Sequence, residues 1–202
     1  MEPTDHELLA ATAAGDGEAF AIFWRRHTPT VMAFGIHRCA SSEDVADLVA
    51  ETFLAAFRAA GRYRAQTATA TPWLLGIATR LASNQHRRLA RWRRVHWRAA
   101  GEPPRFSGEE YEAVEAAIDV ARQAPHVQVA LRAMPVGDRK VLELVAYGQL
   151  RPSEAGLALG ISANAARLRL ARARRQLRER LPSADPLAGL AAPDTEVSSH
   201  DH

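Results

Sequence analysis

Helix-forming periodicity constrains this chain more than any other feature of its sequence. Alanine, leucine, arginine and glutamate recur at three- and four-residue spacing through most of the 202 residues, whereas β-branched alternation never lasts beyond a few positions. We therefore predict an all-α fold. The 47% hydrophobic residues suffice for one or two modest cores, and no apolar run reaches the ~20 residues that cross a bilayer. The acidic N-terminal stretch lacks the basic start of a secretory signal, which favours a cytoplasmic protein without membrane insertion.

Capping residues and helix breakers predict the first helices. A capping box of Thr4 and Glu7 opens the first helix, and a second is expected over residues 17–27. Pro29 suits the first turn of a third helix, which Thr28 would cap. The N-terminal end of the chain is therefore expected to contain three short helices.

Two longer helices are expected next. Ser41 or Ser42 caps a helix over residues 43–60. Residues 62–70 lack an apolar period and indicate a loop, after which a long helix is expected over residues 71–97.

Composition divides the chain into two helical domains joined by a flexible linker. Glycine, proline and acidic residues break the helical pattern after residue 98, so we expect an N-terminal domain over 1–97 and an extended acidic linker over 98–125. The linker either imitates nucleic acid or is a plain spacer that lets the domains sit well apart. A second domain of four helices follows over 126–182, and a disordered tail over 183–202.

Arginines are concentrated in two blocks. Residues 80–98 contain seven arginines and no acid, and residues 167–180 contain seven more with Glu179 as the single acid. Blocks of like charge can be ordinary solvated faces. Two such blocks interleaved with apolar helical spacing favour a polyanion as partner.

The residue types needed for catalysis or metal binding are not grouped. Cys39 is the only cysteine, which excludes an intramolecular disulfide and a cysteine-rich zinc site. The eight histidines are scattered, and neither a glycine-rich phosphate loop nor a nucleophile with a nearby base is present. We therefore expect no enzymatic activity, no metal and no cofactor.

The segment from Pro152 to Leu181 has the pattern of a helix-turn-helix. Gly160 supplies the positive φ of a tight turn, and Ser162 caps a second helix whose apolar positions share one face. Such a helix contacts base edges in the major groove of DNA, although an arginine-rich surface helix would have a similar pattern. The DNA-contacting candidates are Ser162, Asn164, Arg167, Leu168, Arg172 and Arg175. The small core between the two helices is expected to include Leu157, Leu159 and Ile161.

The helix over residues 43–60 carries an acidic stripe. Its acids lie one helical turn apart and continue to Arg58, which makes this face a candidate docking surface for a basic partner helix; an ordinary solvated face is the alternative. The candidate docking residues are Asp44, Asp47, Leu48, Glu51 and Leu54. The buried face is expected to hold Val45, Val49, Phe53 and Phe57.

Aromatic and basic residues lie together around the loop over residues 62–70. Unstacked bases stack on aromatic rings while arginines hold phosphates, so this segment suits single-stranded nucleic acid. Trp73 is more typical of a core residue. The single-strand candidates are Tyr63, Arg64, Arg80, Asn84, Arg87 and Arg88.

Taken in this order, the three segments resemble the sigma-70 family of RNA polymerase initiation factors, in its small extracytoplasmic-function (ECF) type. SSEDVADLVAETFLAAFRAAGRYR resembles the stretch that binds core polymerase and melts the promoter, and TPWLLGIATRLASNQHRR resembles the helix that meets the minus-ten element. ALRAMPVGDRKVLELVAYGQLRPSEAGLALGISANAARLRLARARRQLRERL resembles the domain that recognises the minus-thirty-five element. The resemblance covers most of residues 5–182.

The resemblance implies two sigma domains, a region 2-like bundle and a region 4-like helix-turn-helix, in a subunit that directs promoter-specific initiation. Its partners would be core RNA polymerase and promoter DNA. Many members are held inactive by an anti-sigma factor, which makes such a protein a further candidate partner. The alternatives are a stand-alone helix-turn-helix regulator of duplex DNA, which leaves the acidic stripe unexplained, and an interaction adaptor, which leaves both arginine blocks unexplained.

Several positions depart from the family pattern. Ala50 replaces the usual Gln of the core-binding helix, and Arg80 and Asn84 stand where Asn and Asp are typical. In the second domain the pair 165–166 is Ala-Ala, which is expected to loosen the helix-turn-helix core, and Leu168 offers DNA only apolar contact.

Overall fold

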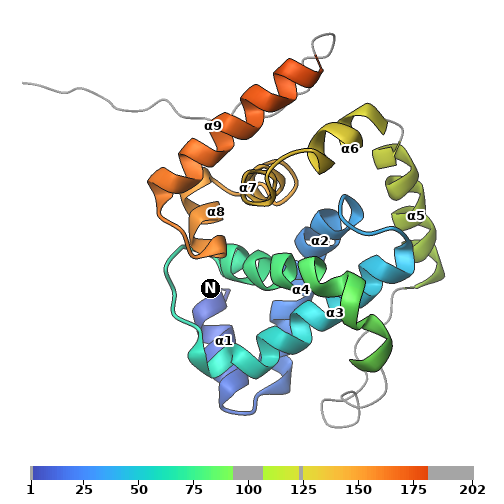
Figure 1. Ribbon diagram of the computed structural model, residues 1–202. Coiled ribbons are helices and arrows are strands. Elements are labelled where there is room, and N and C mark those ends of the chain that lie inside the picture. The colour runs from blue at the N-terminus through green and yellow to red at the C-terminus, as the bar shows by residue number, and fades with distance from the viewer. Residues whose placement is uncertain (1, 93–106, 123–124, 182–202) are drawn as a thin grey trace, which may run out of the picture.

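The structure, a computed structural model, describes residues 2–92, 107–122 and 125–181, with the backbone alone for 84–92. These residues form nine α-helices and one 3-10 turn (Figure 1). In chain order the elements are α1 (Asp5–Ala13), α2 (Gly17–Ile36), α3 (Ser42–Ala59), η1 (Ala60–Arg62), α4 (Thr71–Trp92), α5 (Gly108–Arg122), α6 (Pro125–Arg132), α7 (Val136–Ala146), α8 (Pro152–Leu159) and α9 (Ala163–Arg180).

The all-α fold in two helical units is confirmed. No helix among these residues is long and apolar enough to cross a bilayer.

The N-terminal unit is a bundle of α1 to α4 in which α2 runs unbroken through Pro29. The expected break between residues 27 and 29 is wrong. Pro29 has no N–H and cannot donate to the Arg25 carbonyl four residues earlier. The neighbouring Thr28 hydroxyl donates to a different carbonyl, that of Trp24, at 2.8 Å. Residues before and after the proline, including Phe23 and Phe34, are fully buried on one face of α2. This burial outweighs the single lost backbone hydrogen bond.

Other expected boundaries of the N-terminal unit are confirmed. The Thr4–Glu7 capping box opens α1, and the Ser41 hydroxyl accepts the Asp44 N–H at the start of α3. The loop after η1 leads into α4 at Thr71. Residues 93–97 of the expected long helix, the linker residues 98–106 and the tail from 183 lie outside the described residues.

The acidic segment after residue 107 is a helix, so the extended linker is wrong for this part of the chain. Val114 and Ile118 of α5 are buried, and α5 packs on α3. The Glu115 carboxylate accepts the Ser42 N–H at 3.0 Å, next to the N-terminus of α3. Hydrogen bonds from the side chain and from the N–H of Ser42 lower the pKa of Glu115. An apolar stripe within the acidic run therefore ties α5 to the N-terminal unit.

The C-terminal unit contains the four expected helices, α6 to α9. Gly160 adopts φ 67°, and the Ser162 hydroxyl accepts the Ala165 N–H at 3.1 Å, which confirms the helix-turn-helix turn and its cap. Leu157 is instead 45% exposed and takes no part in the core between the helices. The expected loosening is also not seen: Ala166 is fully buried, and a Cβ built on Gly156 would lie 3.4 Å from the Ala166 Cβ. Small residues on both helices let α8 and α9 approach closely.

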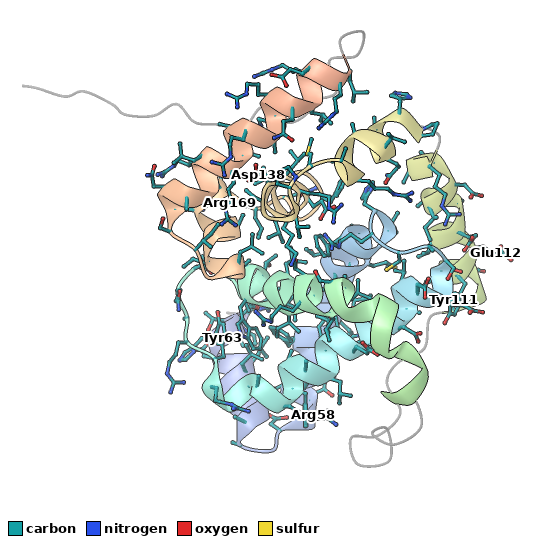
Figure 2. All side chains as sticks on the ribbon, in the orientation of Figure 1. Arg58, Tyr63, Tyr111, Glu112, Asp138 and Arg169 are labelled. Carbon is teal, nitrogen blue, oxygen red and sulfur yellow. The ribbon has the colours of Figure 1, made fainter. Side chains whose placement is uncertain are left out.

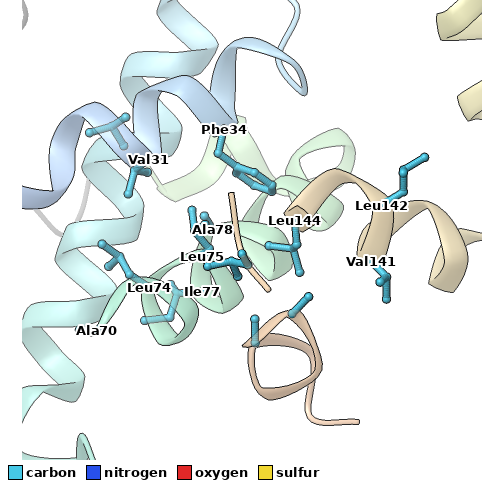
Figure 3. Close-up of a cluster of buried hydrophobic side chains, with 14 of the residues drawn as sticks. Val31, Phe34, Ala70, Leu74, Leu75, Ile77, Ala78, Val141, Leu142 and Leu144 are labelled. Atoms are coloured by element: carbon cyan, nitrogen blue, oxygen red, sulfur yellow. The ribbon is translucent and has the colours of Figure 1, made fainter. Parts of the chain in front are cut away.

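The two units pack directly against each other through α4, α7 and α8. Figure 3 shows Phe34 and Leu75 of the N-terminal unit beside Leu144 of α7. A Cβ on Gly148 would lie 2.7 Å from Leu75 Cδ1, so this glycine sits against the leucine. The expectation that the units sit well apart does not describe this structure, because Leu75 and Leu144 are fully buried in one continuous core.

Polar residues surround this apolar contact. Arg38, after α2, forms an ion pair with Glu143 of α7, and both side chains are 10% exposed. Burial raises the pKa of Glu143, and the charge of Arg38 offsets part of that rise. The His37 and Tyr147 rings stack with centroids 3.8 Å apart. Sequence reasoning missed this interface; the one local signal was a glutamate inside the apolar run of α7.

Candidate functional site

The acidic stripe lies on α3 as expected, but the exposed apolar residues beside it are not the ones that the sequence predicted. Asp44, Asp47, Glu51 and Leu54 are partly exposed. Leu48 is fully buried and is wrong as a docking residue. Its Cδ2 would lie 3.5 Å from a Cβ on Gly35, so it fills the seam between α2 and α3.

Phe57 was expected on the buried face of α3 and is 41% exposed. Its ring makes an edge contact with Phe20 at 5.0 Å between centroids. Phe57 therefore supplies the exposed apolar surface that Leu48 was expected to supply. The candidate docking surface, called the α3 face below, comprises Asp44, Asp47, Glu51, Leu54 and Phe57.

Tyr63 lies at the start of the loop that leads to α4, and its ring is packed rather than open. It is 6% exposed, with the Trp73 ring at 5.0 Å and the His6 ring at 6.2 Å (Figure 2). Burial and the charge of Asp5 raise the pKa of Tyr63. The structure thus contradicts Tyr63 as an open platform for bases and makes it a support for the loop.

The basic candidates around this loop are exposed where their side chains are described. Arg64 donates to the Tyr63 carbonyl at 2.9 Å, and Arg80 projects from the middle of α4 into solvent. Asn84, Arg87 and Arg88 lie one or two helical turns further along α4, and their side chains are outside the described part of the chain.

A buried carboxylate that sequence reasoning missed lies behind the loop. Asp5 accepts hydrogen bonds from Arg26 at 2.8 Å, from His27 Nε2 at 2.9 Å and from the Ala70 N–H at 2.7 Å. Burial by itself would raise the pKa of Asp5, but the hydrogen bonds from His27, Ala70 and Arg26 lower it to about 2. Asp5 is therefore ionised at neutral pH.

The recognition-helix candidates on α9 fall into two groups. Asn164 and Arg167 are exposed in its first turns, next to the Ser162 cap, and Leu168 is 55% exposed. These side chains are available to a ligand approaching the helix N-terminus. Arg175 is also exposed and lies 3.8 Å from Glu179, one turn further along.

Arg172 is 49% exposed and also pairs with a buried carboxylate of the fold. Its Nε and Nη2 donate to both oxygens of the buried Asp138 carboxylate, at 3.1 Å and 3.0 Å. The Arg169 guanidinium lies against α7, where a Cβ on Gly137 would be 2.8 Å from its Nη1 (Figure 2). These contacts anchor the middle of α9 to the start of α7.

Metal-ligating side chains are not assembled in the described residues: no group of three or more His, Cys, Asp or Glu lies close enough to hold an ion. The candidate surfaces for binding polymerase or DNA in this part of the chain are the α3 face, the loop with α4, and the first turns of α9.

Both units match families of known proteins. The family model described as Sigma-70 region 2 matches residues 23–93, and that described as Sigma-70, region 4 matches residues 127–177. The chain is 31% identical to the ECF RNA polymerase sigma factor SigM of Mycobacterium tuberculosis, over 87% of this chain and 84% of SigM. It is 29% identical to the RNA polymerase sigma factor NccH of Alcaligenes xylosoxydans xylosoxydans, over 90% and 97% of the two chains.

Solved structures share the fold. The structure of CnrH in complex with the cytosolic domain of CnrY has a TM-score of 0.62 at 24% identity and covers 88% of this chain and 97% of CnrH. The sigma factor RpoE of Bartonella quintana, in complex with the anti-sigma factor NepR, has a TM-score of 0.53 at 18% identity, covering 81% and 97%. The two family matches and the identity with SigM show that the chain belongs to the sigma-70 family of RNA polymerase sigma factors, in its ECF group, and directs promoter-specific transcription initiation.

Proposed function

We propose that this sigma factor divides promoter recognition between the loop with α4, which contacts the minus-ten element, and α9, which contacts the minus-thirty-five element. The observation that carries this proposal is the helix-turn-helix of α8 and α9. Its second helix begins at a capped N-terminus beside exposed Asn164 and Arg167. The N-terminal residues of such a helix enter the major groove, where Asn recognises adenine and Arg recognises guanine.

The α3 face is the proposed contact with core RNA polymerase. It combines the carboxylates of Asp47 and Glu51 with the exposed ring of Phe57. Interfaces of this kind gain encounter rate and orientation from charge complementarity, and affinity from a central aromatic residue. The partner surface is therefore expected to be basic at its rim and to hold an apolar pocket.

The exposed loop over residues 64–69 and Arg80 are the proposed contacts with the unpaired minus-ten strand, together with Asn84, Arg87 and Arg88 further along α4. Because Tyr63 is buried, backbone and side chains of the loop, rather than that ring, are expected to receive the bases. The protein acts without catalysis of its own, in the cytoplasm, where promoter DNA and polymerase are present.

An anti-sigma factor is a further proposed partner. CnrH is solved in complex with CnrY, and the RpoE of Bartonella quintana with the anti-sigma factor NepR. Their likeness in fold to this chain supports a comparable regulator, which would compete with core polymerase for the sigma domains.

The test of the recognition assignment is promoter binding by the holoenzyme at several salt concentrations. Loss of a base contact in Arg167→Ala should cost ~1–3 kcal/mol at one base pair and relax the preference there. Arg175→Ala, on the same helix and also exposed, is the matched control. It should weaken binding to all sequences alike and lower the salt slope by about one. Equal weakening of every promoter variant by Arg167→Ala would contradict its role as a base contact.

A further inference from the structure

Asp5 joins three segments of the N-terminal unit that are distant in sequence. Its carboxylate is 4% exposed and lies in the first turn of α1. One oxygen accepts from Arg26 of α2, and the other accepts from His27 and from the Ala70 N–H. If position 5 served packing alone, an apolar side chain would suffice, because burying a charge is costly unless it is paired and hydrogen-bonded.

The Ala70 N–H marks the point where the loop enters α4. Ala70 is fully buried, and its carbonyl accepts the Leu74 N–H at 2.9 Å, which is the first hydrogen bond of that helix. Asp5 thus fixes the C-terminal end of the loop to α1. At the other end, Tyr63 packs against His6 of the same helix at 6.2 Å between ring centroids.

The loop between these two anchors is exposed. Its residues 64–69 are open to solvent except for the partly exposed Thr67, whose hydroxyl donates to the Thr69 carbonyl at 2.7 Å. A short loop with few packed side chains takes its conformation from where its ends are held, and restraining those ends reduces the entropy lost on binding a ligand. The restraint in this chain comes from α1.

We propose that Asp5 is a positioning residue for minus-ten recognition. Through the Ala70 N–H it holds residues 64–69 in the conformation that receives the unpaired bases, without touching DNA itself. This inference rests on the proposed role of the loop. It assigns to α1, a helix outside the region 2 match, a part in promoter selectivity.

The test compares Asp5→Asn with Leu9→Ala in the holoenzyme. Asn offers one acceptor oxygen to three donors, so the Ala70 hydrogen bond is weakened or lost. Leu9 is fully buried in α1, so its truncation perturbs the same helix while leaving the Asp5 carboxylate in place. The measured quantity is the ratio of affinities for a pre-melted promoter with the preferred minus-ten bases and for one with substituted bases.

Asp5→Asn is expected to lower this ratio roughly tenfold while core-polymerase affinity stays unchanged, and to speed hydrogen exchange at the Ala70 N–H. Leu9→Ala is expected to keep the wild-type ratio. A wild-type ratio in Asp5→Asn, or an equal loss in both variants, would overturn the proposal. Absence of discrimination by the wild-type holoenzyme would instead contradict the proposed role of the loop.

A milder variant keeps the test decisive if Asp5→Asn does not fold. The Arg26 side chain is 30% exposed, and Arg26→Ala leaves His27 and the Ala70 N–H on the carboxylate. Because fewer donors then hold the Asp5 carboxylate in place, Arg26→Ala is expected to lower the discrimination ratio in the same direction as Asp5→Asn, by a smaller factor. An unchanged ratio in folded Arg26→Ala, with Asp5→Asn unfolded, would count against the proposal.

Discussion

Gly76 of α4 packs so closely against Ala158 of α8 that a Cβ on Gly76 would lie 2.5 Å from the Ala158 carbonyl oxygen. The atom that a side chain would meet is main chain and cannot move aside. The contact therefore requires glycine on α4, and it joins the helix assigned to the minus-ten element to the helix-turn-helix assigned to the minus-thirty-five element.

This closed arrangement cannot engage both elements at once. Their names place them about 25 base pairs apart, which is about 85 Å at 3.4 Å per base pair. A compact chain of this size has a radius of gyration of about 16 Å. The contacts proposed for α4 and α9 therefore require the units to separate when the protein occupies a promoter.

Gly76→Ala is expected to open the free protein, because the added methyl group meets the Ala158 carbonyl. Small-angle X-ray scattering should show a radius of gyration several ångströms above that of the wild type. Gly17→Ala is the matched control: it also replaces a helical glycine, and nothing lies within 4 Å of the added Cβ. Identical scattering from wild type and Gly76→Ala would mean that this contact does not hold the units together.

Charge reversal on the α3 face should weaken the complex with core polymerase. We expect Asp47→Lys with Glu51→Lys to lower the affinity at least about tenfold, because the basic partner would then face like charges. Glu18→Lys serves as the control, since Glu18 is an acid on α2 with a 74% exposed side chain. Affinity is measured by titration of labelled protein with core enzyme, and circular dichroism checks the fold. Unchanged affinity in the double variant would remove polymerase binding from this face.

Replacing Arg172 and replacing Arg175 should change the thermal stability of the protein differently, although both residues lie on α9. Arg172→Ala leaves the buried Asp138 carboxylate without its bidentate partner, so the Tm of the protein should fall by about 5 °C or more. Arg175→Ala removes an exposed i,i+4 pair and should leave the Tm nearly unchanged. Thermal unfolding followed by circular dichroism separates the two. Equal Tm values would show that the Arg172–Asp138 pair does not stabilise the fold.

Asp5 should make the stability of the protein depend on pH in the acid range. Its folded pKa of about 2 lies below the ordinary value of 3.8, so its ionised form stabilises the fold. This contribution, about 2 kcal/mol, is fully present above pH 3.8 and is lost as the pH falls through 2. The measurement is the difference in free energy of unfolding between wild type and Asp5→Asn from pH 7 to pH 2. A difference that does not shrink on acidification would contradict this account of Asp5.

The features that sequence predicts correctly here are set by neighbouring residues. The Thr4–Glu7 capping box and the Gly160–Ser162 turn depend on hydrogen bonds and φ angles within a few positions. The four helices of the C-terminal unit follow from the same kind of local signal.

The predictions from sequence are wrong where tertiary packing determines the local structure. Pro29 lies inside α2 because burial on both sides of it outweighs one missing hydrogen bond. Leu48 is buried because α3 packs against α2, α4 and α5, so its buried surface is wider than a single stripe. Phe57 is exposed because residues spaced by four rotate by about 40° per step around a helix, which carries this position away from the buried face. The sequence separation between Asp5 and Ala70 left no local pattern from which their hydrogen bond could be inferred.

Run-off transcription with core polymerase on promoter fragments tests the central claim most directly. The account predicts discrete transcripts only when the protein and core enzyme are both present, and their loss when either the minus-ten or the minus-thirty-five element is replaced. Initiation that persists after both elements are replaced, or no discrete start site on any fragment, would contradict it.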